Sequence, residues 1–461
     1  MPVNSFADYP MSWQPALPRE AGPQPLYRVL AAQLARDIAS GVLRPGTKLP
    51  PQRELADFLD ISVSTVTKAF RICSNKGLLT STVGSGTFVA YDARTCLSVA
   101  PERQQTVIEM GSMMPETLPQ DGVTAILEQM LQEASASRLY QYSNPKEVRH
   151  QDAARSFLRQ AGALLPENKD VLVSLGGQNA LAAILPALFK AGDRIGVDPL
   201  IYPGLKRAAS LFGIRLVPIN QTNGEMSRHG LLQAISDYHI KGVYVTPDFQ
   251  NPTTHILSHA GRQMLAEIAR EKNLVIVEDA IASLLLPRPV PPVQSLAPER
   301  TVYILSLSKA ILPALRLAYM AVPEPWQGQI EQVLETLELA QSALLLELAD
   351  RIIVSGEYEA ILRERQSSLV RRNELTERIL AGFAVAGDRY SLCRWLVLPA
   401  AWTGERFERE ALRHGVRVLG AQHFAVGRKP WQEGVRLAIG ALRNLDQLEQ
   451  ALTTIKWLLE D

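Results

Sequence analysis

Cysteine is scarce in this chain of 461 residues. Cys73, Cys96 and Cys393 are the only ones, odd in number and far apart. This pattern argues against a disulfide framework and a cysteine-bound zinc site, and it favours a reducing compartment. His255 and His259 are four residues apart, but no glutamate completes an HExxH motif, so no metal site is predicted.

Long apolar runs are missing as well. None approaches the roughly 18 residues of a membrane helix, and the N-terminus has no basic region followed by an apolar core. The net charge is only +1. We therefore expect a cytoplasmic protein that is long enough for about three domain-sized units.

Residues 1–23 are rich in proline and polar residues and contain only scattered aromatics such as Trp13. Such a composition is typical of a flexible N-terminal arm. The pattern changes in residues 24–90, where three stretches with apolar residues at helical spacing are followed by a hairpin pattern around Gly84-Ser85-Gly86. Three helices and a β wing predict a winged helix-turn-helix, whose third helix enters the major groove of DNA.

The charge distribution supports this prediction. Residues 24–90 contain eight basic and four acidic residues, a net charge of +4, which leaves −3 for the rest of the chain. Positive charge is thus concentrated where a DNA backbone requires it. The alternative is a three-helix module that docks another protein.

Specific motifs point the same way. The run from Ile38 to Ala56, the segment SVSTVTKAF and the segment GSGTFV resemble the DNA-binding domain of the GntR family of bacterial repressors. The resemblance implies double-stranded DNA as a partner and Arg53 as a phosphate contact. Val63 stands where many members have arginine. The other implied DNA-binding residues are Ser62, Ser64, Thr65 and Lys68 on the recognition helix and Gly84, Ser85 and Gly86 in the wing.

Residues 91–106 have no clear periodicity and are interpreted as a linker. From residue 107 to residue 461, helical patterns alternate with short apolar runs. This alternation predicts an α/β domain with a mostly parallel sheet.

Polar residues follow several of the predicted strands. Lys309 lies just after the run from Val302 to Leu307, and Asp279 ends the run of residues 274–279. Ligands bind outside the carboxyl ends of parallel strands, and a lysine with a lowered pKa there can form a Schiff base with an aldehyde. Ser306 and Arg316 suit a phosphate. An aldehyde that carries a phosphate is pyridoxal 5'-phosphate, PLP.

Each residue also has an ordinary explanation, such as a solvated lysine, a helix cap or a turn. Their joint order, however, resembles the fold-type I aminotransferases. The resemblance implies that Lys309 forms the Schiff base, Asp279 pairs with the pyridine nitrogen, Asn251 bonds the ring hydroxyl and Tyr202 stacks on the ring. The implied phosphate ligands are Gly176, Gly177, Gln178, Ser306 and Arg316. Arg436 is implied to clamp a substrate carboxylate, and Tyr142 to reach the partner subunit's phosphate.

A GntR-type domain joined to an aminotransferase-like domain is the layout of the MocR subfamily of regulators, which the whole chain resembles. The resemblance implies a PLP-binding homodimer with a small C-terminal α+β subdomain. Three residues depart from the pattern. Ile281 replaces a tyrosine that bonds the ring oxygen, while Thr254 and Glu147 replace glycines.

Three functions are compatible with this layout. The first is a PLP-dependent, DNA-binding transcriptional regulator whose aminotransferase-like domain senses an amino acid, an amine or PLP. The second is an active aminotransferase with an autoregulatory DNA-binding domain, and the third is a regulator whose large domain has lost PLP. The effector, the operator and the sign of regulation are not predicted.

Overall fold

The computed structural model describes residues 11–15, 25–44, 46–75, 78–82, 86–90, 107–119, 121–133, 136–166, 170–288, 290–338, 340–427, 430 and 432–460. The chain divides into two compact units, Met1–Gln105 and Thr106–Asp461. Within the described ranges, no helix is both long and apolar enough to cross a membrane.

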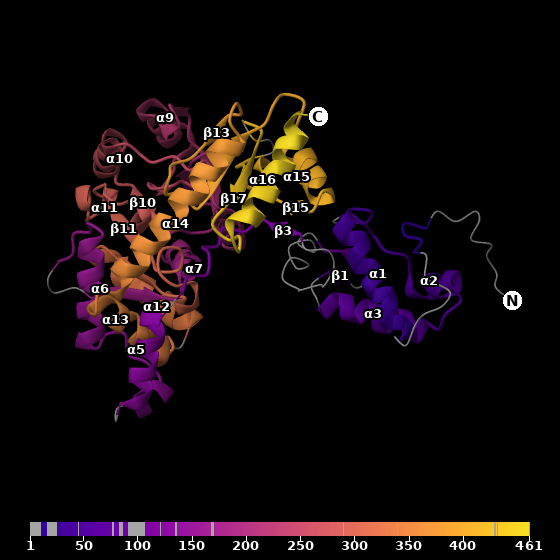
Figure 1. Cartoon of the computed structure of the whole chain (residues 1–461), viewed down its shortest axis with the longest axis horizontal. Coiled ribbons are helices and arrows are strands. Elements are labelled where there is room, and N and C mark those ends of the chain that lie inside the picture. Colours follow the sequence, from indigo (N-terminus) through magenta and orange to yellow (C-terminus); the bar gives the residue numbers. More distant parts are fainter. Residues whose placement is uncertain are drawn as a thin grey trace. The chain divides into compact units, whose positions relative to one another are not determined.

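The first unit is the predicted winged helix-turn-helix (Figure 1). Its helix α1 ends where Gly41 adopts a φ of 82°, and its third helix is capped by Ser62, whose hydroxyl accepts a hydrogen bond from the Thr65 amide at 3.2 Å. The wing strands pair antiparallel from Leu79 with Val89 to Thr82 with Gly86. The elements are α1 (Leu26–Ser40), α2 (Gln52–Leu59), α3 (Val63–Asn75), β1 (Leu79–Thr82) and β2 (Gly86–Val89).

The prediction of a flexible arm over residues 1–23 is wrong for residues 11–15. Trp13 is only 3% exposed and belongs to the core of the first unit. Its indole nitrogen donates a hydrogen bond to Asp37 of α1 at 2.7 Å. Burial of a large aromatic ring together with a satisfied N–H group explains why this segment is fixed. The rest of residues 1–23, the wing tip Gly84-Ser85 and the predicted linker 91–106 lie outside the described residues.

The second unit contains a seven-stranded sheet in which only one strand, β12, runs antiparallel to its neighbours. The mostly parallel sheet predicted from the alternating pattern is therefore confirmed. In spatial order the strands are β4 (Leu172–Ser174), β12 (Ala318–Ala321), β11 (Thr301–Ser306), β10 (Val275–Asp279), β9 (Gly242–Val245), β5 (Arg194–Val197) and β6 (Arg215–Pro218).

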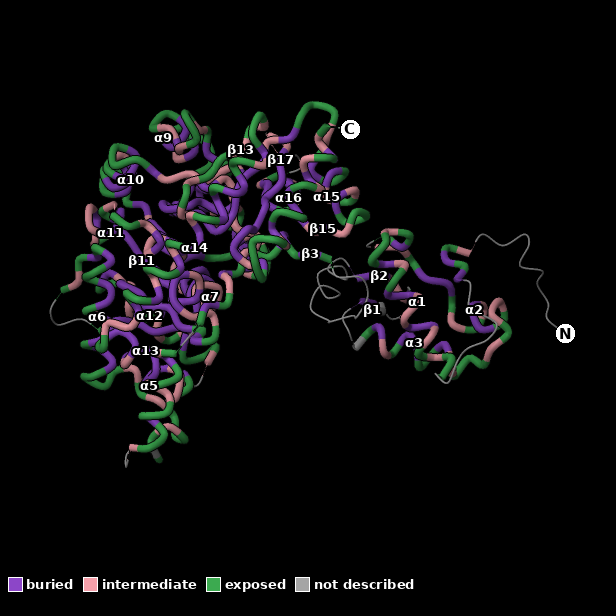
Figure 2. The backbone as a smooth tube through the Cα atoms, in the orientation of Figure 1, coloured by how far each residue is buried: buried purple, intermediate pink, exposed green. Residues whose placement is uncertain are grey.

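Helices cover both faces of this sheet, so its strands are buried on both sides except at the edge strand β6 (Figure 2). In β11, Val302 and Ile304 enter one core cluster, and Tyr303 and Leu305 enter the other. The cluster that contains Val302 and Ile304 also contains residues of α7 (Gly177–Leu188), α8 (Pro203–Leu211) and α12 (Glu324–Leu337). On the opposite face lie α5 (Asp121–Gln132), α6 (Val148–Gln160), α9 (Arg228–Tyr238), α10 (His259–Lys272), α11 (Val293–Leu296), α13 (Ala343–Val354) and α14 (Glu357–Ile379).

A smaller α+β subdomain completes the second unit. The long helix α14 joins it to the large sheet, since Leu369 belongs to the large core and Leu375 to the small one. The strand β3 (Ile108–Glu109) pairs with β15 (Val416–Arg417). The antiparallel sheet contains β13 (Val385–Ala386), β14 (Cys393–Val397), β17 (Gly434–Ala438) and β16 (Leu419–Gly420), flanked by α15 (Gly404–Arg413) and α16 (Leu445–Glu460).

Candidate functional site

Polar residues from distant parts of the sequence meet at the carboxyl edge of the large sheet. Asp279 ends β10, and Ser306 ends the neighbouring parallel strand β11 just before Lys309. Asn251 lies in the loop after β9, and Tyr202 caps α8 after β5. Because these strands are parallel, their ends point to the same crevice, which is where such sheets bind ligands.

Lys309 is held at this edge by a segment that the sequence did not indicate. Its amino group donates a hydrogen bond to the Met113 carbonyl and lies 3.6 Å from the Met114 sulfur. Burial, followed by the positive charges of Arg436 and Arg316, lowers the pKa of Lys309 to about 8. A large neutral fraction of this amine near pH 8 makes it a nucleophile.

Asp279 is the most informative acid of the site. It is only 3% exposed, and one of its carboxylate oxygens accepts a hydrogen bond from the Tyr244 hydroxyl at 2.8 Å. The other oxygen, Oδ1, is buried without a partner among the described residues. Burial raises the pKa of Asp279 to about 6, against the lowering effect of the Tyr244 bond. A buried, unsatisfied acceptor is costly unless a ligand supplies a donor.

The start of α7 brings a helix N-terminus close to the Arg316 guanidinium. Gly176 caps this helix with a φ of 83°, and a Cβ there would be 3.3 Å from the Arg316 guanidinium. A Cβ added at Gly177 would meet no other described atom within 4 Å beyond its own helix backbone and chain neighbours. A helix N-terminus with an adjacent arginine favours a phosphate. Ser306 accepts a hydrogen bond from the Ser308 amide at 3.3 Å, and Gln178 donates to the Gly204 carbonyl at 3.2 Å.

Arg436 of β17 reaches the loop that carries Asn251. It donates hydrogen bonds to Asn251 at 2.7 Å and to the Gly111 carbonyl, and its guanidinium carbon is 4.9 Å from the Phe424 ring centre. Its Nε has no partner within the described part of the chain, and burial lowers the pKa of the guanidinium. Burial, followed by the charge of Asp279, raises the pKa of Tyr202.

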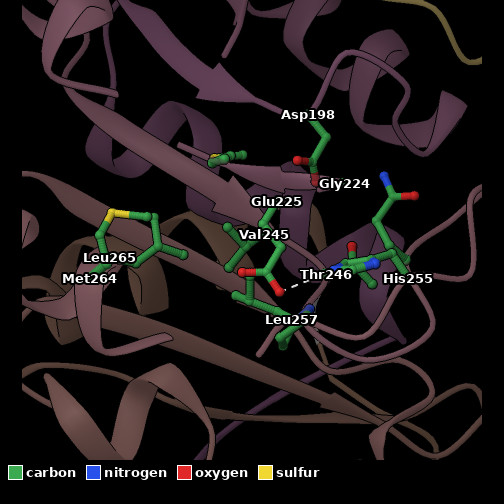
Figure 3. Close-up of a pocket in the computed structure, with 12 residues that line it drawn as sticks. Asp198, Gly224, Glu225, Val245, Thr246, His255, Leu257, Met264 and Leu265 are labelled. Atoms are coloured by element: carbon green, nitrogen blue, oxygen red, sulfur yellow. Dashed lines mark hydrogen bonds and ion pairs between the residues drawn. The ribbon is translucent and has the colours of Figure 1, made fainter. Parts of the chain in front are cut away.

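The loop that carries Asn251 is fixed from outside the site. Glu225 lies in β8 (Glu225–Met226), which pairs with β7 (Gln221–Thr222). Its carboxylate accepts hydrogen bonds from the Ser258 amide at 2.8 Å and the Ser258 hydroxyl at 2.9 Å. It also pairs with His255 at 3.2 Å (Figure 3). The cavity beside these residues is only about 20 Å³, so it suits a water molecule rather than a ligand.

The residues predicted to bind DNA gather on α2 and α3 of the first unit. Arg53, Ser62, Ser64 and Lys68 are exposed, and Thr65 is partly buried. Of the predicted wing residues, Gly86 begins β2, and Gly84 and Ser85 lie outside the described residues. In the portion that the structure describes, no group of three or more metal-binding side chains is assembled.

Comparison with known proteins agrees with both units. Residues 106–455 match the aminotransferase class I and II family, and residues 26–89 match the bacterial regulatory proteins of the gntR family. The chain is 43% identical over 462 residues, 100% of both chains, to YdeF of Bacillus subtilis, an uncharacterized HTH-type transcriptional regulator. This chain belongs to the MocR subfamily of GntR-type transcriptional regulators.

A curated relative and a solved structure are also similar to this chain. It is 27% identical over 327 residues to the pyridoxine biosynthesis transcriptional regulator PdxR of Corynebacterium glutamicum, covering 69% of this chain and 70% of PdxR. The second unit has the fold of the kynurenine aminotransferase of Pyrococcus horikoshii, with a TM-score of 0.71 and 19% identity over 77% of this chain and 91% of the enzyme. The regulator thus joins a GntR DNA-binding domain to an aminotransferase-like domain.

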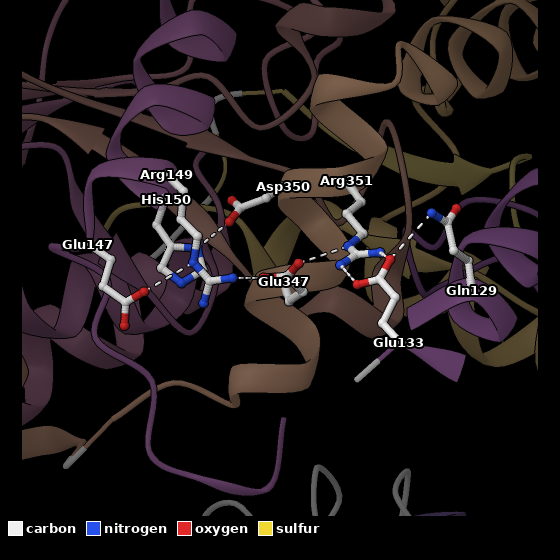
Figure 4. A network of polar contacts seen from close by, with 8 residues as sticks. All are labelled: Gln129, Glu133, Glu147, Arg149, His150, Glu347, Asp350 and Arg351. Carbon is white, nitrogen blue, oxygen red and sulfur yellow. Dashed lines mark hydrogen bonds and ion pairs between the residues drawn. The ribbon is translucent and has the colours of Figure 1, made fainter. Parts of the chain in front are cut away.

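The residues that depart from the family pattern lie in three different surroundings. Ile281 packs against the large core. Its side chain has no hydroxyl to take the place of the tyrosine hydroxyl expected at this position. Thr254 is buried with a φ of 64°, a conformation that glycine adopts more easily. Glu147 belongs to a chain of ion pairs across α5, α6 and α13 (Figure 4), formed with Arg149, Glu347, Arg351 and Glu133.

Sequence reasoning missed Met113, Tyr244, Ser308 and Arg365 as parts of the site. Ser308 lies inside the Ser-x-Ser-Lys string, and its buried hydroxyl has no partner among the described residues. Tyr244 is in the apolar run of β9, where its side chain faces Asp279. Of these four residues, only Ser308 could have been suspected from the sequence, because it directly precedes Lys309.

Replacing Asp279 by asparagine is expected to stabilise the regulator without PLP at neutral pH. A pKa raised from 3.8 to about 6 means that ionisation of Asp279 costs the folded state about 3 kcal/mol above pH 6. The unbonded amide of asparagine offsets about 1–2 kcal/mol. We therefore expect a net gain of about 1–2 kcal/mol at pH 7.5, measured by urea unfolding.

The gain should shrink as pH falls from 6 toward 4, because protonation then removes the same cost from the wild type. Asp152→Asn, on an exposed position of α6, serves as the control. An equal gain at pH 5 and pH 7.5 would contradict the assignment of the effect to the charge of Asp279.

Proposed function

We propose that the second unit of this regulator binds PLP around Lys309 and thereby senses an amino acid, an amine or PLP itself. The observation that carries the proposal is the buried, unsatisfied Asp279 oxygen at the end of β10, on the same sheet edge as a lysine whose pKa is lowered. A protonated pyridine nitrogen is a suitable donor for this oxygen. The relationship to PdxR, named for pyridoxine biosynthesis, supports the choice of ligand.

The other site residues fit this cofactor. Gly176, Gly177, Ser306 and Arg316 would hold its phosphate at the start of α7, with Gln178 fixing the start of α8 through Gly204. Tyr202 would stack on the ring, and Asn251 would bond the ring hydroxyl. When bound, PLP supplies an aldehyde that captures primary amines and a ring that withdraws electrons. Arg436 would clamp the carboxylate of an effector that has one.

The absorption spectrum of the full-length protein tests this proposal. With added PLP, the wild type should develop a visible band that Lys309→Ala lacks, and Lys241→Ala, a change at an exposed lysine, should keep the band. Effector amines should then change the band. If the wild type gives no band, the second unit is a domain without PLP, and its signal enters by another route.

The second candidate function is transamination, and Ile281 argues against an efficient reaction because it replaces a tyrosine that bonds the cofactor ring. The missing hydroxyl removes one hydrogen bond to the cofactor, which is worth about 0.5–1.5 kcal/mol and is too little to prevent binding. We propose that PLP is retained and that turnover is slow. Amino-group transfer to a keto acid at a rate ordinary for aminotransferases would overturn the second half of this proposal.

Assembly and signalling complete the proposal. We infer that the regulator acts as a homodimer on double-stranded DNA, with the exposed Tyr142 available to the partner subunit. Sedimentation of the full-length protein measures the assembly. An effector can change DNA binding only if it binds the conformers with different affinity, so operator affinity should change in its presence.

Arg53→Ala should weaken binding to all DNA sequences alike. Arg53 is exposed at the start of α2, as expected for a phosphate contact. Loss of one such contact should lower the slope of log affinity against log salt by about one. Fluorescence anisotropy with an operator and an unrelated duplex measures both quantities, and a loss confined to one sequence would assign Arg53 to base contact instead.

A further inference from the structure

The hydroxyl groups at the first turn of the recognition helix form hydrogen bonds within the protein. The Ser62 hydroxyl accepts a hydrogen bond from the Thr65 amide and is within 2.9 Å and 2.8 Å of the Ser64 and Thr65 hydroxyls. The Thr67 hydroxyl donates to Gln52 at 2.7 Å. These hydroxyls are therefore hydrogen-bonded within the protein, and they keep lone pairs that can accept a further bond from DNA.

Val63 is the exception to this polar surface. It is the first residue of α3 and is 41% exposed, outside the core of the first unit. A single exposed valine needs no explanation by itself. Its position decides its meaning, because the N-terminal residues of a recognition helix contact base edges in the major groove.

We propose that Val63 contacts the 5-methyl group of a thymine in the major groove. That methyl group is the apolar feature by which a base pair is distinguished there, and apolar side chains contact it. Lys68 and Arg71 are exposed farther along α3 and, as cations, suit phosphates or guanine. The operator half-site should therefore contain a T·A pair facing the start of α3. This inference rests on the DNA-binding role of the first unit.

Replacement of thymine by deoxyuridine removes only the methyl group and so tests the contact directly. Duplexes are first selected from a random pool with the full-length protein, and each dT is then replaced in turn by dU. One position in each half-site should bind the wild type about fourfold more weakly with dU, as expected for one buried methyl group. Cytosine at that position should bind more weakly than 5-methylcytosine.

Variants assign the effect to Val63. The dT to dU ratio should fall to near one in Val63→Ala and to an intermediate value in Val63→Thr, which keeps one methyl group. Val42→Ala makes the same change at a valine that is 70% exposed and outside α3, and should keep the fourfold ratio. Thermal melting checks that each variant is folded.

Two results would overturn the inference while leaving the DNA-binding role intact. One is a selected site in which no dT is sensitive to dU, and the other is a Val63→Ala variant that keeps the fourfold ratio. Failure to select any sequence above the random pool would instead count against the DNA-binding role itself.

Discussion

Replacing Trp13 by alanine is expected to lower the free energy of unfolding of the first unit by about 3–5 kcal/mol. The indole is buried in the core of that unit and donates to Asp37 at 2.7 Å, so the change removes both packing and a satisfied hydrogen bond. A unit this small has little stability to spare. We therefore expect DNA affinity to fall with it, while the second unit keeps its fold.

Denaturant unfolding of the full-length protein, followed by hydrogen exchange of the α1 amides, measures this loss. Trp457→Ala is the matched control, because Trp457 of α16 is 49% exposed. The control should change stability by less than about 1 kcal/mol, since surface substitutions usually have small effects. A Trp13→Ala variant with normal protection of α1 would show that residues 11–15 are not part of the folded core.

The burial of Trp13 could not be predicted from the sequence, whereas the helices around it could. The helices of the first unit are predictable because their apolar residues repeat at helical spacing and end at Gly41 or begin at Ser62. A single tryptophan in a proline-rich segment has no period. Whether it is buried depends on the space between helices, which is a property of the folded unit.

The same distinction holds in the second unit. Asp279 and Lys309 follow apolar strands directly, so the parallel topology alone places them at one edge. Met113, which holds the Lys309 amino group, is 196 residues away in the sequence. Such a contact depends on how β3 and the small subdomain return to the large sheet, and no local pattern indicates it.

Arg365 is the strongest case of a residue that local pattern conceals. It lies in the highly charged sequence of α14, where exposure is the ordinary expectation, yet it is almost fully buried. Its guanidinium donates to the carbonyls of Ala310 at 2.9 Å, Ile311 at 3.1 Å and Glu116 at 3.1 Å. Two of these carbonyls directly follow Lys309, so Arg365 fixes the turn that positions the site lysine.

Arg365→Leu is therefore expected to destabilise the second unit by about 3–5 kcal/mol, because three buried carbonyls lose their donors. PLP affinity, measured by the visible band, should fall at least about tenfold as the turn loosens. Arg365→Lys should recover little of either, since one ammonium group cannot reproduce the fork of donors. Burial already lowers the pKa of the arginine to about 10, and a lysine there would give up its proton more readily.

Arg363→Leu is the control on the same helix. Arg363 is exposed, and its side chain forms a surface pair with Glu359 at 3.5 Å, so its loss should cost about 0.5 kcal/mol or less. If Arg365→Leu destabilises the unit but leaves PLP affinity unchanged, Arg365 supports the fold alone. If both quantities fall together while Arg363→Leu changes neither, Arg365 positions Lys309, because the two variants remove the same charge from the same helix and differ in the carbonyls left without a donor.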